Sequence, residues 1–67
     1  MLSPDALNTL QQNLQTQNTL CELMQHMYNL ADSLDGFPKE TLKETMPSLE
    51  KVQVWLQKNA TELLAKE

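Results

Sequence analysis

Arginine is absent from this sequence, and glycine, cysteine, histidine, tryptophan, tyrosine and phenylalanine each occur once. One glycine cannot build a glycine-rich phosphate-binding loop. One cysteine cannot form an internal disulfide, and together with one histidine it cannot supply the four ligands of structural zinc. No apolar run reaches the length of a membrane span, and the N-terminus does not resemble a secretory signal. We therefore expect a cytoplasmic protein with no metal, no cofactor and no membrane contact.

Positive charge is also scarce. The chain has five lysines against nine acidic residues, and its formal net charge is −4. Every lysine follows Pro38, so the first half carries the whole negative excess. Nucleic-acid-binding proteins neutralise phosphates with clustered lysine and arginine. This composition argues against a nucleic-acid partner.

The 67 residues form a single domain, 1–67. A core of this size rarely contributes more than about 3–5 kcal/mol, and small domains usually add a disulfide, a metal or a second chain. With the first two excluded, we expect a homodimer or higher oligomer, or docking on another protein.

Ser3-Pro4-Asp5 has the pattern of a helix start, with a serine cap, a proline at the first helical position and an acid in the first turn. No glycine or proline follows until Gly36, which predicts one helix of about 31 residues. Asp35-Gly36-Phe37-Pro38 predicts a corner, with Gly36 in a left-handed conformation and Phe37 folded back on the helices.

After the corner, leucines recur every seven residues at Leu42, Leu49, Leu56 and Leu63. Pro47 interrupts this stripe, and proline inside a helix costs about 3 kcal/mol. We expect a short helix over 38–45, a kink or break near Pro47, and a longer helix over 46–65. The predicted fold is all-α: an antiparallel helical hairpin that pairs into a helical bundle. This architecture resembles that of small bacterial, plasmid and phage hairpins, including repressor-of-primer proteins and type III secretion co-chaperones.

The segment before the corner carries an apolar arc about 180° wide, whereas one packed helix covers about 100°. The arc consists of Leu20, Cys21, Leu23, Met24, Met27, Tyr28, Leu30, Ala31 and Leu34. One hairpin mate would leave part of it uncovered, so we expect a further partner there. The predicted partner-binding residues are Leu20, Leu23, Met24, Met27, Tyr28, Leu30 and Trp55.

Several residues admit two interpretations. A heptad pattern runs through Leu7, Leu10, Leu14, Gln17, Cys21, Met24, Tyr28 and Ala31. Its one polar member, Gln17, fixes the register or lies at a wet end of the bundle. We expect Cys21 to be a small core residue, with a reactive thiol as the alternative. Trp55 covers the edge of the seam or anchors an interface.

No constellation for catalysis is present, and we expect no enzymatic activity. His26 falls on the polar arc without a nucleophile or an orienting acid near it. Cys21, Met24 and Met27 are soft ligands, but His26 points away from them on the wheel, so packing explains them better.

The leading hypothesis is a small protein-binding regulator, inhibitor or chaperone that covers a surface of a larger protein with its apolar face. The methionines suit such a surface because unbranched thioethers adapt to irregular partners. One alternative is an RNA-binding hairpin dimer that uses the glutamine-, asparagine- and threonine-rich face of the first helix. The other is a purely structural oligomerisation module.

Overall fold

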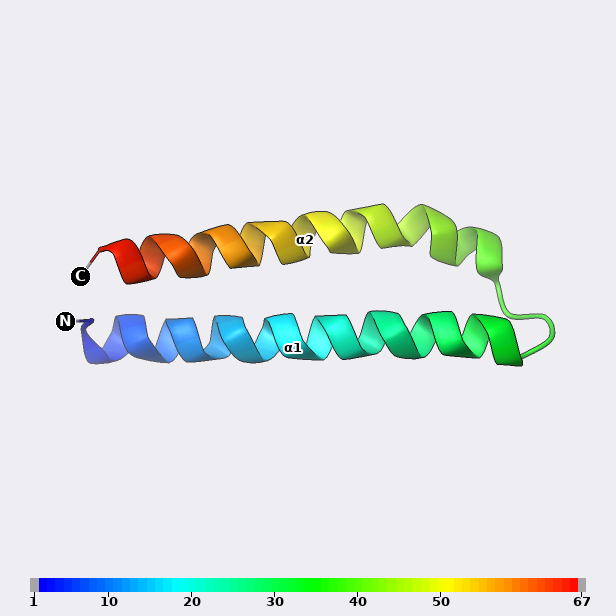
Figure 1. Ribbon diagram of the computed structural model, residues 1–67, viewed down its shortest axis with the longest axis horizontal. Coiled ribbons are helices and arrows are strands. Elements are labelled where there is room, and N and C mark those ends of the chain that lie inside the picture. The colour runs from blue at the N-terminus through cyan, green and yellow to red at the C-terminus, as the bar shows by residue number, and fades with distance from the viewer. Residues whose placement is uncertain (1, 67) are drawn as a thin grey trace.

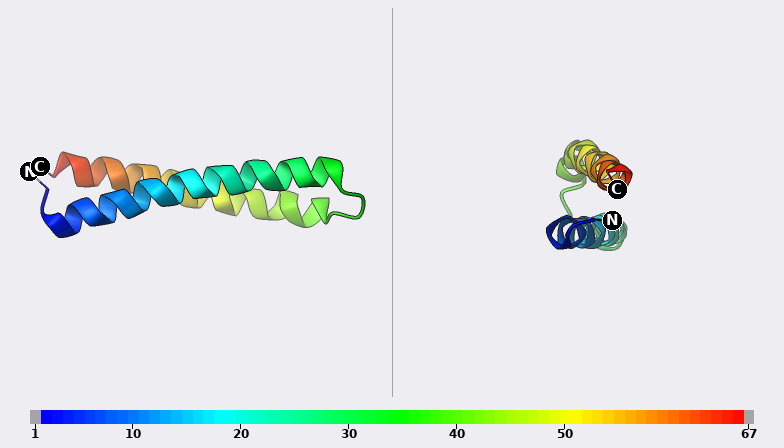
Figure 2. Two further views of the ribbon diagram at one scale, coloured as in Figure 1. Left: turned by 90° about the horizontal axis from the view of Figure 1, so that it is seen from below. Right: turned by 90° about the vertical axis from the view of Figure 1, so that its left-hand side faces the viewer.

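Two antiparallel helices make up nearly all of the computed structural model, which describes residues 2–66. They are α1, Pro4–Ser33, and α2, Lys39–Ala65, joined by a short corner (Figure 1). The first turn of α1 and the last turn of α2 lie at the same end of the rod, away from the corner (Figure 2), and the extents of the rod are 51 × 16 × 12 Å. The predicted all-α antiparallel hairpin is confirmed.

The start of α1 follows the sequence signal closely. Ser3 Oγ accepts a hydrogen bond of 3.1 Å from the Ala6 backbone N–H, and Pro4 occupies the first helical position. Asp5 lies in the first turn, where a negative charge complements the helix dipole. The helix runs for 30 residues without a break, close to the predicted length.

At the corner, Gly36 has the predicted positive φ, +81°. The C-cap residue of α1 is Leu34. Gly36 lies two residues after it and therefore belongs to the turn, not to the cap. The Phe37 N–H donates to the Leu34 carbonyl oxygen across this turn at 3.5 Å. Phe37 then packs against the buried cluster at this end, as predicted.

The predicted break near Pro47 is wrong, because α2 is one continuous helix that contains this proline (Figure 1). Met46 before it is 3% exposed, and Leu49 after it packs on the same cluster. Packing on both sides of Pro47 thus holds the helix in phase. Because proline has no backbone N–H, the carbonyl oxygen of Lys43, four residues earlier, receives no hydrogen bond from Pro47. Both residues are exposed.

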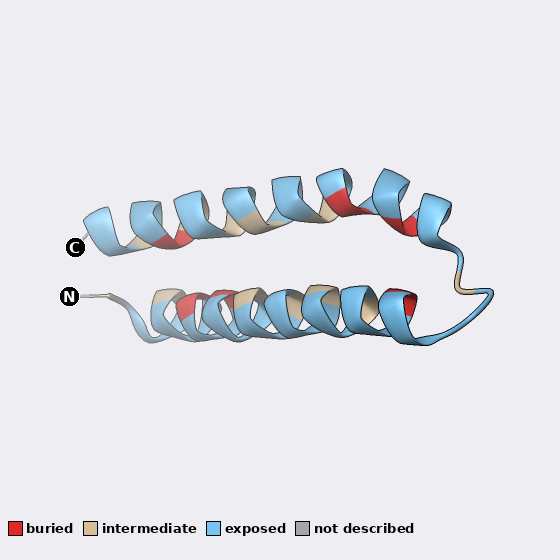
Figure 3. Cartoon of the chain, turned by 45° about the vertical axis from the view of Figure 1, so that its right-hand side comes forward, coloured by how far each residue is buried: buried red, intermediate tan, exposed pale blue. Residues whose placement is uncertain are grey.

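Where the helices meet, buried and half-buried residues alternate at spacings of three and four, as in a coiled coil (Figure 3). We call this set the seam. On α1 it comprises Ala6, Leu10, Asn13, Gln17, Leu20, Met24, Met27 and Ala31, and on α2 Leu42, Met46, Leu49, Gln53, Leu56, Ala60 and Leu63.

Half of the heptad predicted on α1 is therefore wrong by one residue. Leu10, Gln17, Met24 and Ala31 lie in the seam. The other four, Leu7, Leu14, Cys21 and Tyr28, each follow a seam residue and are exposed. The prediction of Cys21 as a core residue is wrong for this reason, since Leu20 takes the place in the seam.

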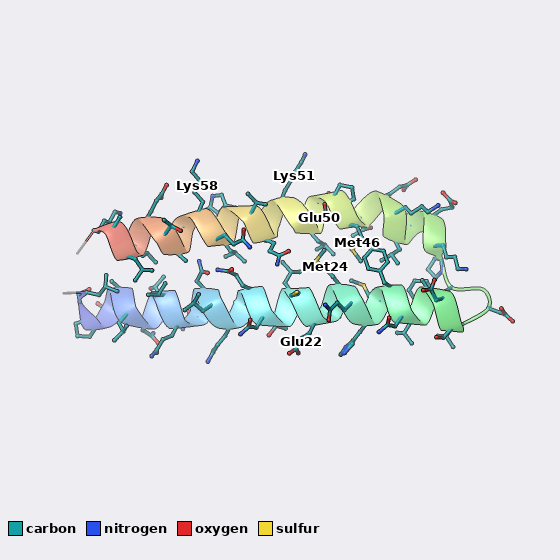
Figure 4. The ribbon with its side chains drawn as sticks, viewed as in Figure 1. Glu22, Met24, Met46, Glu50, Lys51 and Lys58 are labelled. Atoms are coloured by element: carbon teal, nitrogen blue, oxygen red, sulfur yellow. The ribbon has the colours of Figure 1, made fainter. Side chains whose placement is uncertain are left out.

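The seam has an apolar part near the corner, where Ala31, Leu42 and Met46 are buried and Phe37 and Leu49 pack against them. Met24 and Met27 join this cluster from α1. In Figure 4, Met24 and Met46 lie between the helices, each on the side that faces the other helix.

Further along, the seam is polar. Asn13 is only 6% exposed, and its Nδ2 donates to the Leu56 carbonyl oxygen at 3.0 Å and to Asn59 Oδ1 at 3.1 Å. Gln17 Nε2 donates to Asn13 Oδ1 at 2.6 Å. Gln17 is thus a member of a satisfied amide network rather than a frayed end, which supports the register interpretation.

Gly36→Val should destabilise the hairpin by about 1–2 kcal/mol, because a residue with a Cβ resists positive φ. An added Cβ would meet nothing within 4 Å, so backbone strain alone is expected to act. Gly36→Asn is the matched control, since asparagine visits this conformation more readily. Thermal melts that rank valine and asparagine equally would contradict this explanation.

Asn13→Ala should cost about 1–3 kcal/mol, because it leaves buried hydrogen-bonding groups of the network without a partner. Asn18→Ala is the matched control: it makes the same change on an exposed position of the same helix. Both variants gain the same helix propensity, so the difference between their denaturation midpoints isolates the network. Equal midpoints would show that the network contributes no stability.

Candidate interaction surfaces

The most unusual feature of the surface is how much apolar side chain it retains. Among residues 2–66, five hydrophobic residues are buried, and none of the larger side chains there is fully buried. Ten large hydrophobic residues are 45–62% exposed, namely Leu7, Leu14, Leu23, Tyr28, Leu30, Leu34, Val52, Val54, Trp55 and Leu64. Contiguous exposed apolar surface marks sites of interaction in soluble proteins.

The apolar arc of α1 accounts for four of these ten residues, Leu23, Tyr28, Leu30 and Leu34. α2 covers the middle of the arc and leaves both edges open. On one edge, Leu23 and Leu30 each precede a seam residue. On the other edge, Leu7, Leu14, Cys21 and Tyr28 each follow one, and we call these four the Tyr28 stripe. The hairpin therefore presents two separate apolar edges on its two long sides.

The second surface combines both helices. In an antiparallel pair, the residues that precede seam positions of one helix lie on the same side as those that precede seam positions of the other. Leu23 and Leu30 thus share a side with Val52, which precedes Gln53, and with Trp55, which lies one turn from Val52. We call Leu23, Leu30, Val52 and Trp55 the Trp55 face.

Trp55 does not cover the seam, contrary to one interpretation of the sequence. It is 62% exposed and borders a shallow hollow formed by Lys58, Asn59 and Glu62 of the same helix. Its ring lies outward because Leu56 takes the seam position. A large exposed indole with a neighbouring hollow is a typical anchor for a protein partner.

A second shallow hollow lies beside Leu23 on α1. Its other walls are uncharged, and the lining consists of Gln12, Gln15, Thr16, Thr19, Leu20 and Leu23. The hollow extends the Trp55 face along α1 with groups that form hydrogen bonds but carry no charge.

The two helices differ sharply in charge. From Ala6 to Cys21, α1 has no charged residue on any side. α2 carries four lysines and four glutamates. Lys51 and Lys58 point away from α1, as Figure 4 shows. Interface cores are depleted of charge, so α1 has the composition of a contact helix and α2 that of a solvated one.

The seven residues predicted to bind a partner divide into two groups. Leu20, Met24 and Met27 are half-buried in the seam. Leu23, Leu30 and Trp55 lie along the same long side of the hairpin, whereas Tyr28 lies on the opposite side. The role of all seven in binding stays a prediction. Sequence reasoning missed Val52, although its place three residues before Trp55 is the signal that could have found it.

No group of candidate metal ligands is found within residues 2–66, and the expectation of no enzymatic activity stays a prediction. No three histidine, cysteine, aspartate or glutamate residues gather there in a way that could hold a metal ion. His26 and Cys21 are both exposed. Neither helix, over the same residues, is long and apolar enough to cross a membrane. Comparison with protein-family models, curated proteins and solved structures finds no match to the chain.

Trp55→Ala should change the free energy of unfolding by less than about 0.5 kcal/mol, as is usual for exposed positions. Met46→Ala, at the most buried position of the cluster, should cost about 2–5 kcal/mol. Thermal and urea melts of the two variants measure this contrast. A Trp55→Ala variant as unstable as Met46→Ala would place the indole in the core.

Proposed function

We propose that the protein is a small protein-binding regulator that acts by occupancy, covering an apolar surface of a larger protein with its Trp55 face. The observation that carries this proposal is the exposure of Leu23, Leu30, Val52 and Trp55 on one side of a hairpin that has little core of its own. Tryptophan is enriched among residues that dominate binding energy. The same face lies on rigid helices, so it needs little ordering on binding.

The uncharged flank of α1 defines the chemistry of the partner. Its glutamine and threonine side chains offer hydrogen bonds around the apolar centre. A partner surface with an apolar patch and a neutral polar rim suits this arrangement, whereas a strongly charged surface gains nothing from α1. The consequence of binding is to block, hold or stabilise that surface, as an inhibitor or chaperone does in the cytoplasm.

The charged residues support a protein partner over RNA. The four lysines of α2 are interspersed with four glutamates, and Lys51 and Lys58 point away from the amide-rich α1 (Figure 4). These two lysines therefore do not combine with the amide-rich segment into one surface. Phosphate neutralisation needs clustered cations, which this arrangement does not provide.

The test begins with affinity capture from the native host and identification of the captured protein by mass spectrometry. The purified partner is then titrated with the wild type and with Trp55→Ala. Truncation of an anchor of this kind typically costs at least about 2 kcal/mol, or roughly thirtyfold in Kd.

Val54→Ala is the matched control for this titration. Val54 is 61% exposed and adjacent in sequence, but it lies on another side of α2, in a hollow with Pro47, Glu50 and Lys51. We expect its Kd to equal that of the wild type. Equal losses in both variants would show that the Trp55 face has no special role, and a failure to capture any protein would favour a structural oligomerisation module.

A further inference from the structure

The Tyr28 stripe takes no part in the function proposed above, because it lies on the opposite side from Trp55. Leu7, Leu14 and Tyr28 are about half exposed, and Cys21 is exposed between them. The four residues recur every seven positions over about 32 Å of helix. We propose that a second copy of this chain covers this stripe, with its own α1 antiparallel to the first.

The spacing of the stripe is self-complementary. A two-fold axis midway between Leu14 and Cys21 places Leu7 opposite Tyr28 of the second copy, and Leu14 opposite Cys21 of the second copy. One contact pairs a leucine with the larger Tyr28, and the other pairs a leucine with the smaller Cys21. The two-fold symmetry repeats each contact once. This is the arrangement that a symmetric dimer interface requires, since the same patch must fit itself.

The same axis also fits α2. On this side of the hairpin, Lys43, Glu50, Gln57 and Leu64 of α2 follow seam positions and recur at the same seven-residue spacing as the Tyr28 stripe. Their midpoint lies between Glu50 and Gln57. The hydrogen bonds of Asn13 to Leu56 and Asn59 place the midpoint of the Tyr28 stripe beside residues 52–54 of α2. Both midpoints therefore lie at nearly the same height, so one axis serves both helices.

The charges on this side are compatible with that axis. It places Lys43 opposite Leu64 of the second copy, and Glu50 opposite Gln57 of the second copy. No like charges face each other, and α1 brings none between Ala6 and Cys21. Like-charge juxtaposition is what usually prevents an incorrect pairing.

The available area is sufficient for a stable dimer. The long side of the molecule measures 51 by 16 Å, an area of about 800 Å². Each partner of a standard protein interface contributes about that much. The Trp55 face suits a second copy less well: Leu23 and Leu30 continue a repeat that begins with Thr9 and Thr16, so an antiparallel copy would oppose both leucines with threonines.

Sedimentation equilibrium of the isolated protein tests the dimer without any partner. We expect a dimer at micromolar concentration and a melting temperature that rises with concentration. Leu14→Gln should raise the dimer Kd by about a hundredfold or more, because a symmetric interface loses the leucine twice. Leu23→Gln, the same change on the Trp55 face, should leave the dimer Kd unchanged. A wild-type monomer, or equal effects of the two variants, would overturn the proposal.

Oxidative cross-linking tests the register. Leu14→Cys should form a covalent dimer through Cys21 of the second copy. Wild-type protein should not, because its two Cys21 residues are offset by seven positions, about 10 Å, and disulfides need Cβ atoms about 3.8 Å apart. Leu23→Cys is the control on the other face. Cross-linking of wild type through Cys21, or of Leu23→Cys as efficiently as Leu14→Cys, would overturn the antiparallel arrangement.

Discussion

A hairpin of two helices has one seam, and this constraint explains why apolar side chains of α1 remain exposed. Each helix can hide only the stripe that faces its mate, about 100° of its circumference. The leucine stripe of α2 is narrow enough to be covered in this way. The apolar arc of α1 is nearly twice as wide, so both its edges stay in water. Each of the two surfaces described above includes one edge of that arc: Leu23 and Leu30 belong to the Trp55 face, and Cys21 and Tyr28 to the Tyr28 stripe.

The amide network decides which residues occupy those edges. Asn13 ties the middle of α1 to Leu56 and Asn59 of α2, and Gln17 satisfies its remaining acceptor. An apolar pair at this point would pack at several alignments of α1 against α2. These hydrogen bonds form at one alignment of the two helices only. The network thus fixes the height of α1 against α2. Because Asn13, and not Leu14, faces α2, the network also sets the rotation of α1, which puts Leu23 on the side of Trp55 and Cys21 on the side of Glu50.

The sequence was sufficient to predict the helices, the corner and the leucine stripe of α2, because each rests on a local signal such as Ser3-Pro4 or Gly36. It was not sufficient for the register of α1, since two seven-residue repeats lie side by side within the wide arc. The repeat with the larger side chains, which includes Leu7 and Tyr28, looks like the better seam. The structure uses its neighbour, whose small and amide residues, Ala6 and Asn13, allow close approach and the bond to Asn59. Pro47 was misjudged because tertiary packing outweighed its local penalty.

The two adjacent repeats of α1 also suggest an order of events. The corner holds α2 beside α1 at an effective concentration in the millimolar range, which favours the intramolecular seam over a contact with another chain at lower concentration. The repeat left over is the one with larger apolar side chains, and it stays available after folding. The lysines and glutamates of α2 add charged surface to the hairpin, which favours its solubility despite the exposed apolar side chains. In this arrangement α2 supplies the charged surface of the hairpin together with Val52 and Trp55 of the Trp55 face, while α1 supplies the uncharged stretch from Ala6 to Cys21.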